Sequence, residues 1–279
     1  MPDRRFDAAG AVTVTGGLAL LVYAISKAPD VGWGSARTIL LLIASGVILA
    51  AFVLIELRGR APLMPFSIFR IRSVLGANVV GFLLGAVIFA DFFILTFYVQ
   101  ETLHWSALKT GVTFLATAGT TVIWAGVAQA LTTRYGPRPV IVTGLLVLAG
   151  SMVAYTRIPV DGHFWPDLLP AYLAFALGLA FAFVPVTIAA LAQVAPREAG
   201  LINTSQQIGG AIGIAIVTTI FRTKAKDLGF TPQGFVTGYQ DAFWALIALA
   251  LLGAVAAFIL LRGVKREHVA EQEPAGVAV

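Results

Sequence analysis

The chain has 279 residues, of which 58% are hydrophobic and 12% are charged, and its mean hydropathy is +0.89. Soluble globular domains carry about a quarter charged residues, so no soluble packing could hide this much apolar surface. The apolar residues also come in runs long enough to cross a bilayer core of about 30 Å. The composition therefore excludes an ordinary soluble protein.

The net charge of +5 does not indicate nucleic acid as a partner, because the basic residues lie in short segments between the apolar runs. The chain has no cysteine, which excludes disulfides and a cysteine nucleophile. Its three histidines lie outside the apolar runs and show no clustered metal-ligand pattern. We therefore expect no metal, no cofactor and no enzymatic activity.

Hydropathy windows of about 20 residues predict eight transmembrane helices. Helices are favoured over barrel strands, because these runs exceed about ten residues and are apolar on all faces. The run after Arg4 and Arg5 is too long for the apolar region of a signal peptide, so we interpret it as the first span. The expected fold class is an all-α integral membrane protein. The predicted spans are 8–26, 38–57, 74–99, 108–131, 139–156, 168–194, 201–221 and 242–261.

The basic residues are divided unequally between the two sides of the bilayer that these spans define. The side with both termini carries Arg4, Arg5, Arg58, Arg60, Arg70, Arg72, Arg134, Arg138, Arg197, Arg262, Lys265 and Arg266. The other side carries Lys27, Arg37, Lys109, Arg157, Arg222, Lys224 and Lys226. The positive-inside rule places the richer side, and with it both termini, in the cytoplasm. The expected location is the cell membrane.

Small residues spaced four apart within several spans predict close helix packing, since lipid provides no hydrophobic drive for helices to associate. They are Ala77, Gly81 and Gly85, then Ala174, Gly178 and Ala182, then Gly209 and Gly213 with Gly210 beside them. Pro185 lies inside the sixth predicted span, where we expect it to kink the helix.

Asp91 is the only acidic or basic residue placed well inside a predicted span. A charged carboxylate in hydrocarbon costs several kcal/mol, so such a residue is rare unless it faces a cavity, a partner or a proton path. We consider two interpretations of Asp91. It takes part in proton coupling or contacts a cationic substrate, or it lies at the edge of a water-filled cavity without a function.

Further polar residues within or near the spans are candidates for lining a cavity. An alternative interpretation, which we favour, is that they form hydrogen bonds between helices and hold the bundle together. The candidates are Asn78, Tyr98, Gln100, Asn203, Gln206 and Gln207. The last three fall on one helix face by their spacing.

Four segments, in their order along the chain, resemble the fourteen-span drug:proton antiporter branch of the major facilitator superfamily. The loop segment Arg134 to Pro139 resembles that family's cytoplasmic loop motif, in which Arg134, Gly136 and Arg138 match and Thr133 stands where an acidic residue is expected. The other segments are Phe6 to Gly10 with Gly16 and Gly17, Pro62 to Pro65 with Phe69, Arg70, Asn78 and Tyr98 to Gln100, and Asn203 to Gly210 with Gly213.

The resemblance implies that the chain corresponds to the last eight spans of a fourteen-span transporter. It implies two linking helices in 1–57, a cytoplasmic loop in 58–73, a C-terminal six-helix half in 74–262 and a cytoplasmic tail in 263–279. The implied partners are the lipid bilayer, a small-molecule substrate, protons and a missing N-terminal half. The implied function is proton-coupled efflux of hydrophobic or cationic compounds. The alternative is a non-transporting remnant, or an accessory subunit that packs with a partner.

Overall fold

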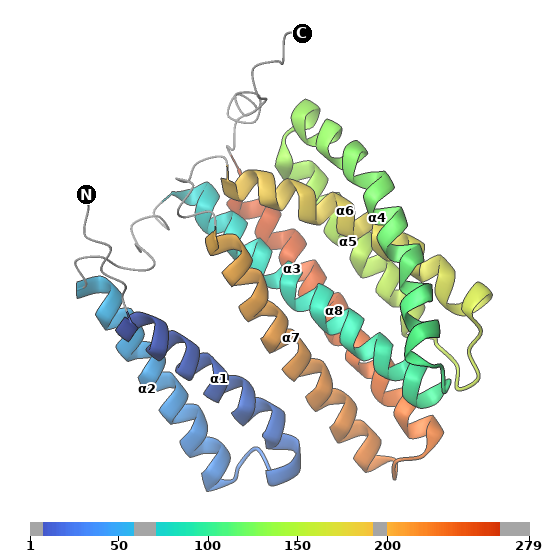
Figure 1. Ribbon diagram of the computed structural model, residues 1–279, viewed down its shortest axis with the longest axis horizontal. Helices are drawn as coiled ribbons and strands as arrows, with labels where there is room; N and C mark the ends of the chain where they lie inside the picture. Colours follow the sequence, from blue (N-terminus) through green and yellow to red (C-terminus); the bar gives the residue numbers. More distant parts are fainter. Residues whose placement is uncertain (1–7, 59–70, 192–199, 263–279) are drawn as a thin grey trace. The chain divides into compact units, whose positions relative to one another are not determined.

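The computed structural model describes residues 8–58, 71–191 and 200–262. Within these ranges the chain is built of helices, and eight of them are long and apolar enough to cross a membrane (Figure 1). This result confirms the all-α membrane fold. The helices are α1 (Ala8–Val31), α2 (Ala36–Arg58), α3 (Arg72–Phe97), α4 (Ala107–Tyr135), α5 (Pro137–Tyr155), α6 (Leu169–Leu191), α7 (Gly200–Asp227) and α8 (Pro232–Leu260). Two short π-helical turns, η2 (Tyr98–Thr102) and η3 (Phe164–Leu168), adjoin α3 and α6.

Several helices extend beyond the spans expected from hydropathy. The largest difference is in α8, which begins at Pro232 and not at residue 242. Its first turns are polar, but Pro232 stands at the start of the helix and the Thr231 hydroxyl accepts a hydrogen bond from the Gly234 amide at 3.1 Å. Both features favour a helix start. A hydropathy window detects apolar length, so it misses a polar helical extension.

Some sequence predictions fall outside the described residues. They concern most of the predicted loop 58–73, the end of the sixth span at 192–194 and the tail 263–279. At the edges of that loop, Arg58 is the last residue of α2 and Arg72 is the first residue of α3.

The described residues divide into two compact units, one formed by α1 and α2 and the other by α3 to α8. In the first unit the two helices form an antiparallel hairpin (Figure 1). The buried Ser45 hydroxyl donates to the Gly17 carbonyl at 2.8 Å, and an added Cβ on Gly17 would meet the Leu49 side chain. The absence of a side chain at Gly17 therefore lets α2 approach the α1 backbone.

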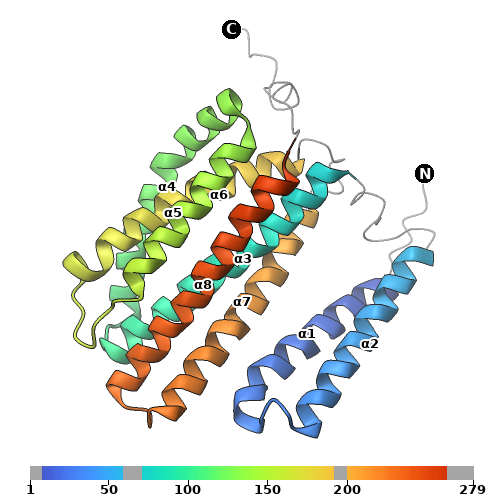
Figure 2. The same ribbon diagram turned by 180° about the vertical axis from the view of Figure 1, so that it is seen from behind.

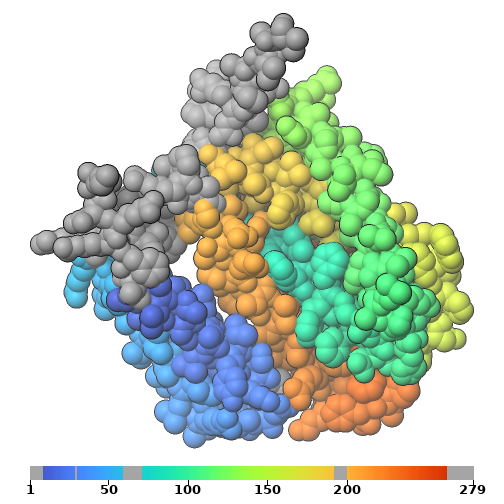
Figure 3. All heavy atoms as spheres, in the orientation of Figure 1, coloured from blue at the N-terminus to red at the C-terminus, as the bar shows by residue number. Residues whose placement is uncertain are grey.

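In the six-helix unit, α3 is the most buried helix and α4 is largely exposed. Figures 1 and 2 show α3, α7 and α8 packed side by side, with α5 on the other side of α8 and α4 on the outside. In Figure 3, α4 covers much of the visible face of this unit. The core lies where α3, α5, α6 and α8 meet.

Glycines on α3 and α7 bring these two helix backbones into direct contact. An added Cβ on Gly85 would collide with the Gln206 carbonyl of α7. In the opposite direction, a Cβ on Gly209 would meet the Phe82 carbonyl and one on Gly213 the Ala86 carbonyl of α3. We call these contacts the α3–α7 seam. The spacing of the small residues reflects this close approach of the two backbones.

A similar close contact joins α5 and α6. A Cβ on Gly144 would lie 2.5 Å from the Ala182 amide nitrogen, and one on Gly178 would lie 2.7 Å from the Leu148 amide nitrogen. Helix α6 runs without interruption through Pro185, which is buried and has no amide hydrogen to donate to the preceding turn.

Candidate functional site

Asp91 lies on α3 and is only 2% exposed. Within its described ranges, it is the only buried acidic residue of the six-helix unit. Its Oδ1 atom is buried and has no hydrogen-bond partner among the described groups. An ionisable residue buried inside a transmembrane helix is a candidate functional group.

Two tyrosines from other helices lie within electrostatic range of this carboxyl group. Tyr155 ends α5 and Tyr172 lies near the start of α6, and both phenol groups interact electrostatically with Asp91. Both rings are almost fully buried, with their centroids 6.3 Å apart. The Tyr155 hydroxyl has no hydrogen-bond partner among the described residues. We call Asp91, Tyr155 and Tyr172 the buried acid cluster.

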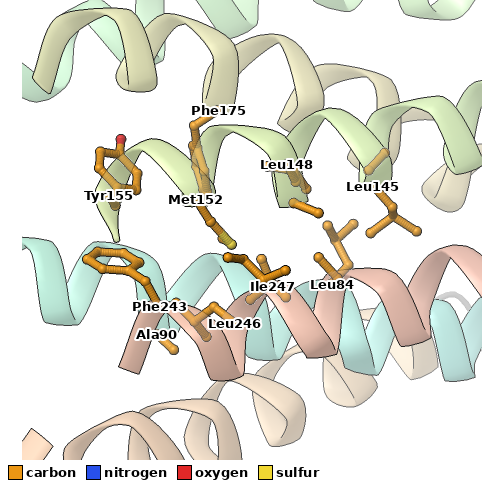
Figure 4. Close-up of a cluster of buried hydrophobic side chains, with 14 of the residues drawn as sticks. Leu84, Ala90, Leu145, Leu148, Met152, Tyr155, Phe175, Phe243, Leu246 and Ile247 are labelled. Atoms are coloured by element: carbon orange, nitrogen blue, oxygen red, sulfur yellow. The ribbon is translucent and has the colours of Figure 1, made fainter. Parts of the chain in front are cut away.

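Aromatic side chains surround the buried acid cluster. Phe114 of α4 stacks on Tyr172 with a centroid distance of 5.6 Å, and it meets Phe92 of α3 edge-on at 5.1 Å. On the other side, Phe243 of α8 lies 4.9 Å from the Tyr155 ring. Figure 4 shows the Tyr155 hydroxyl pointing away from Phe243. Rings from α3, α4 and α8 thus surround the polar groups with an apolar shell.

An aliphatic layer adjoins this shell. Figure 4 shows Met152 and Leu148 of α5 above Leu246 and Ile247 of α8. These residues belong to the continuous core of the six-helix unit. The core therefore separates the buried acid cluster from the end of the bundle where α5 begins.

Tyr98 and Gln100, two of the candidates for lining a cavity, lie in the π-helical turn η2 that follows α3. The Tyr98 side chain is fully buried, and its hydroxyl donates to the Pro159 carbonyl at 2.7 Å. Gln240 of α8 donates to the neighbouring Ile158 carbonyl at 2.9 Å. Tyr98 and Gln240 thus attach the loop between α5 and α6 to the bundle, whereas Gln100 is half-buried.

Asn78 forms a hydrogen bond between helices. Its amide donates to the Val74 carbonyl within α3 at 2.9 Å, and its Oδ1 atom accepts from the Ser205 hydroxyl of α7 at 2.8 Å. Gln206 is buried next to this pair. These contacts favour the interpretation in which the polar residues hold α3 and α7 together.

The other two polar residues predicted on α7, Asn203 and Gln207, are exposed in the six-helix unit. The structure therefore separates Gln206, which faces α3, from its two neighbours on the same helix. It does not bring Asn203 or Gln207 to the buried acid cluster.

The loop motif forms the short connection between α4 and α5. Gly136 is the one residue between the two helices, and its backbone has φ +85°, a conformation that favours glycine. The Arg134 guanidinium lies over the neighbouring Tyr135 ring. In contrast, the Arg138 guanidinium reaches Phe258 of α8, with its Cζ atom 4.1 Å from the ring centroid.

Sequence reasoning missed Tyr155, Tyr172, Ser205 and Phe258. Tyrosines near the ends of spans are typical of the membrane interface, so their burial beside Asp91 had no separate signal in the sequence. Ser205 and Phe258 depend on which helices are neighbours, and hydropathy does not give this information.

In the described ranges, no three histidine, aspartate or glutamate side chains gather where they could hold a metal ion. The fold is that of a membrane protein with several transmembrane helices, and the buried acid cluster lies inside its helical bundle. The sequence model of the Major Facilitator Superfamily matches residues 6–218. The chain belongs to the major facilitator superfamily.

Several similar proteins are named for drug resistance or export. The puromycin resistance protein of Streptomyces alboniger is 35% identical over 272 residues, which are 92% of this chain and 54% of that protein. The tetracenomycin C resistance and export protein of Streptomyces glaucescens is 30% identical over 229 residues, 81% of this chain and 42% of that protein. The lincomycin resistance protein LmrB of Listeria monocytogenes is 26% identical over 269 residues, 92% of this chain and 57% of that protein. The chain spans about half the length of these relatives.

Proposed function

We propose that this chain is the C-terminal eight-span part of a proton-coupled efflux carrier in the cell membrane. Membership of the major facilitator superfamily supports a transport function, and the names of the relatives favour export of hydrophobic or cationic drugs. Because the chain spans about half of these relatives, the proposal includes an N-terminal half that encloses the substrate site together with it. Carriers of this fold place that site between their two halves.

The observation that carries the proposal is the buried acid cluster. Burial disfavours the charged form of a carboxyl group, and no described basic side chain forms an ion pair with Asp91. In this proposal, such a group takes up a proton and releases it when water or a cation reaches it during transport. We propose that Asp91 is the proton-coupling group, and that the buried phenol of Tyr155, which interacts with it electrostatically, tunes its environment.

The proposed orientation places both termini in the cytoplasm. Within the six-helix unit, Arg72, Arg134, Arg138 and Arg262 lie at the end where α3 and α5 begin and α4 and α8 end. The opposite end carries Lys109, Arg157, Arg222, Lys224 and Lys226. The excess of basic residues over the whole chain supports the orientation.

The test is transport by this chain joined to the N-terminal half of the Streptomyces alboniger relative, reconstituted in liposomes. Puromycin and the cationic dye ethidium serve as probes, and an imposed pH gradient drives transport. We expect the chimera to export at least one probe and the Asp91→Asn variant to lose the dependence on the pH gradient. The matched control is Asp161→Asn, which removes an exposed carboxylate from the loop between α5 and α6.

The unfused chain serves as the second control, and we expect it to show no gradient-driven export. Equal export by the chain alone, as a monomer, would contradict the need for a second half. An Asp91→Asn chimera with unchanged gradient dependence would show that Asp91 does not couple transport to protons.

A further inference from the structure

A basic site lies away from the buried acid cluster, at the end of the bundle where α5 begins and α8 ends. Two arginines from separate parts of the chain approach one aromatic ring there. The Arg138 Cζ atom lies 4.1 Å from the centroid of Phe258, and the Arg262 Cζ atom lies 5.2 Å from it. Each distance is within the range of a cation–π contact. The ring therefore brings two positive charges close together.

Neither guanidinium group has an anionic partner among the described residues. Ion pairs of the described chain, such as Lys27 with Asp30 and Lys224 with Asp241, lie elsewhere. The Arg138 Nε atom is buried and has no hydrogen-bond acceptor in the described part of the chain. The first turn of α5 also holds no acidic residue, and its N-cap, Gly136, has no side chain that could cap the helix. The positive N-terminal end of the α5 helix dipole therefore adds to the positive electrostatic potential of the two arginines.

An apolar path leads from this pair of arginines along α8. Leu251, Val255 and Phe258 recur at helical spacing, so they share one face of α8, and Arg262 follows just after the end of the helix. The three apolar members are 43%, 55% and 49% exposed. Figure 2 shows α8 at the front of the six-helix unit in that view. The exposed face thus combines an apolar strip, which suits an acyl chain, with a basic end.

We propose that Arg138, Phe258 and Arg262 bind the phosphate group of an anionic phospholipid whose acyl chain lies along this face of α8. Guanidinium groups match phosphate oxygens with paired hydrogen bonds. Basic residues between transmembrane helices at the membrane surface attract anionic headgroups. An arginine that only anchors a helix at the membrane surface would lie in water. That role does not explain the buried Nε atom of Arg138 or the position of two guanidinium groups on the ring of Phe258.

Native mass spectrometry of the purified chain in detergent tests the site, with phosphatidylglycerol and phosphatidylcholine as the added lipids. We expect Arg138→Gln and Arg262→Gln each to weaken binding of the first phosphatidylglycerol by about fivefold and to leave phosphatidylcholine binding unchanged. The matched control is Arg134→Gln, which removes a positive charge at the same end but away from Phe258. This control should retain the affinity of the unmodified chain.

A second variant, Phe258→Leu, keeps the apolar strip and removes the ring that holds the two guanidinium groups. It should also weaken binding of phosphatidylglycerol, and circular dichroism should show an unchanged helical content. An equal loss in Arg134→Gln would reduce the effect to general charge attraction and overturn the site. Displacement of the lipid by inorganic phosphate at matched concentration would show a free-anion site, which would also overturn the proposal.

Discussion

Replacing Gly85 with alanine tests the α3–α7 seam directly. The new Cβ would lie 2.7 Å from both the carbonyl carbon and the Cα atom of Gln206, and closer still to its carbonyl oxygen. Carbon atoms in ordinary contact are about 3.5–4.0 Å apart, so α3 and α7 would have to separate locally by roughly 1 Å. All three blocking atoms belong to the backbone, so a change of side-chain rotamer cannot relieve the collision.

The expected cost follows from this geometry. Overpacking of a close-packed interior costs about 1–3 kcal/mol, while alanine in place of glycine returns up to about 1 kcal/mol of helix propensity. Gly119→Ala on α4 is the matched control, because its added Cβ meets nothing within 4 Å apart from its chain neighbours and the nearby backbone of its own helix. Both variants share the propensity gain, so the free energy of unfolding should be lower for Gly85→Ala than for Gly119→Ala by about 1–3 kcal/mol.

Unfolding of the purified chain in detergent, by titration with sodium dodecyl sulfate and followed by circular dichroism, measures this difference. The hydrogen bond between Asn78 and Ser205 joins the same two helices, so Gly85→Ala should also weaken it. Equal stability of the Gly85→Ala and Gly119→Ala variants would refute the backbone contact on which the reasoning depends.

Two further predictions concern topology and the attachment of a loop. In intact cells, an impermeant thiol reagent should label Leu228→Cys, which lies in the turn between α7 and α8. It should not label Thr133→Cys, which lies near the end of α4. The reverse pattern would overturn the proposed orientation. Tyr98→Phe removes the hydrogen bond to the Pro159 carbonyl, so the free energy of unfolding should fall by about 1–2 kcal/mol. Tyr135→Phe, on a half-exposed ring, should change it little, and an equal effect of the two would show that the loop is not held by Tyr98.

The helices could be predicted from the sequence because a segment in lipid must form its backbone hydrogen bonds within itself, which favours a helix. A helix that spans the bilayer is also a long apolar run, and such a run is easy to recognise in a sequence. It predicted the end of α8 well and its start poorly, since the polar turn at Pro232 carries no hydropathy signal. Capping by Thr231 and a proline at the first helical position were the available signals for that start.

The candidate site was predicted only in part. Asp91 stands out because one acid in an apolar run has few explanations. Tyr155 and Tyr172 lie on other helices, and a single sequence does not say which helices meet. The glycine spacing indicated that backbones would touch, but it did not indicate that Gly85 would meet Gln206.

The connection through Gly136 also constrains how α4 can move. Because one residue separates α4 from α5, the two helix ends at that point stay together in any rearrangement. Helix α4 has 29 residues, so at 1.5 Å per residue it is about 43 Å long. A tilt of about 5° around Gly136 would carry Ala107, at its far end, through roughly 4 Å. A small rotation at Gly136 would thus move the opposite end of α4 by about the length of a side chain at the other membrane surface.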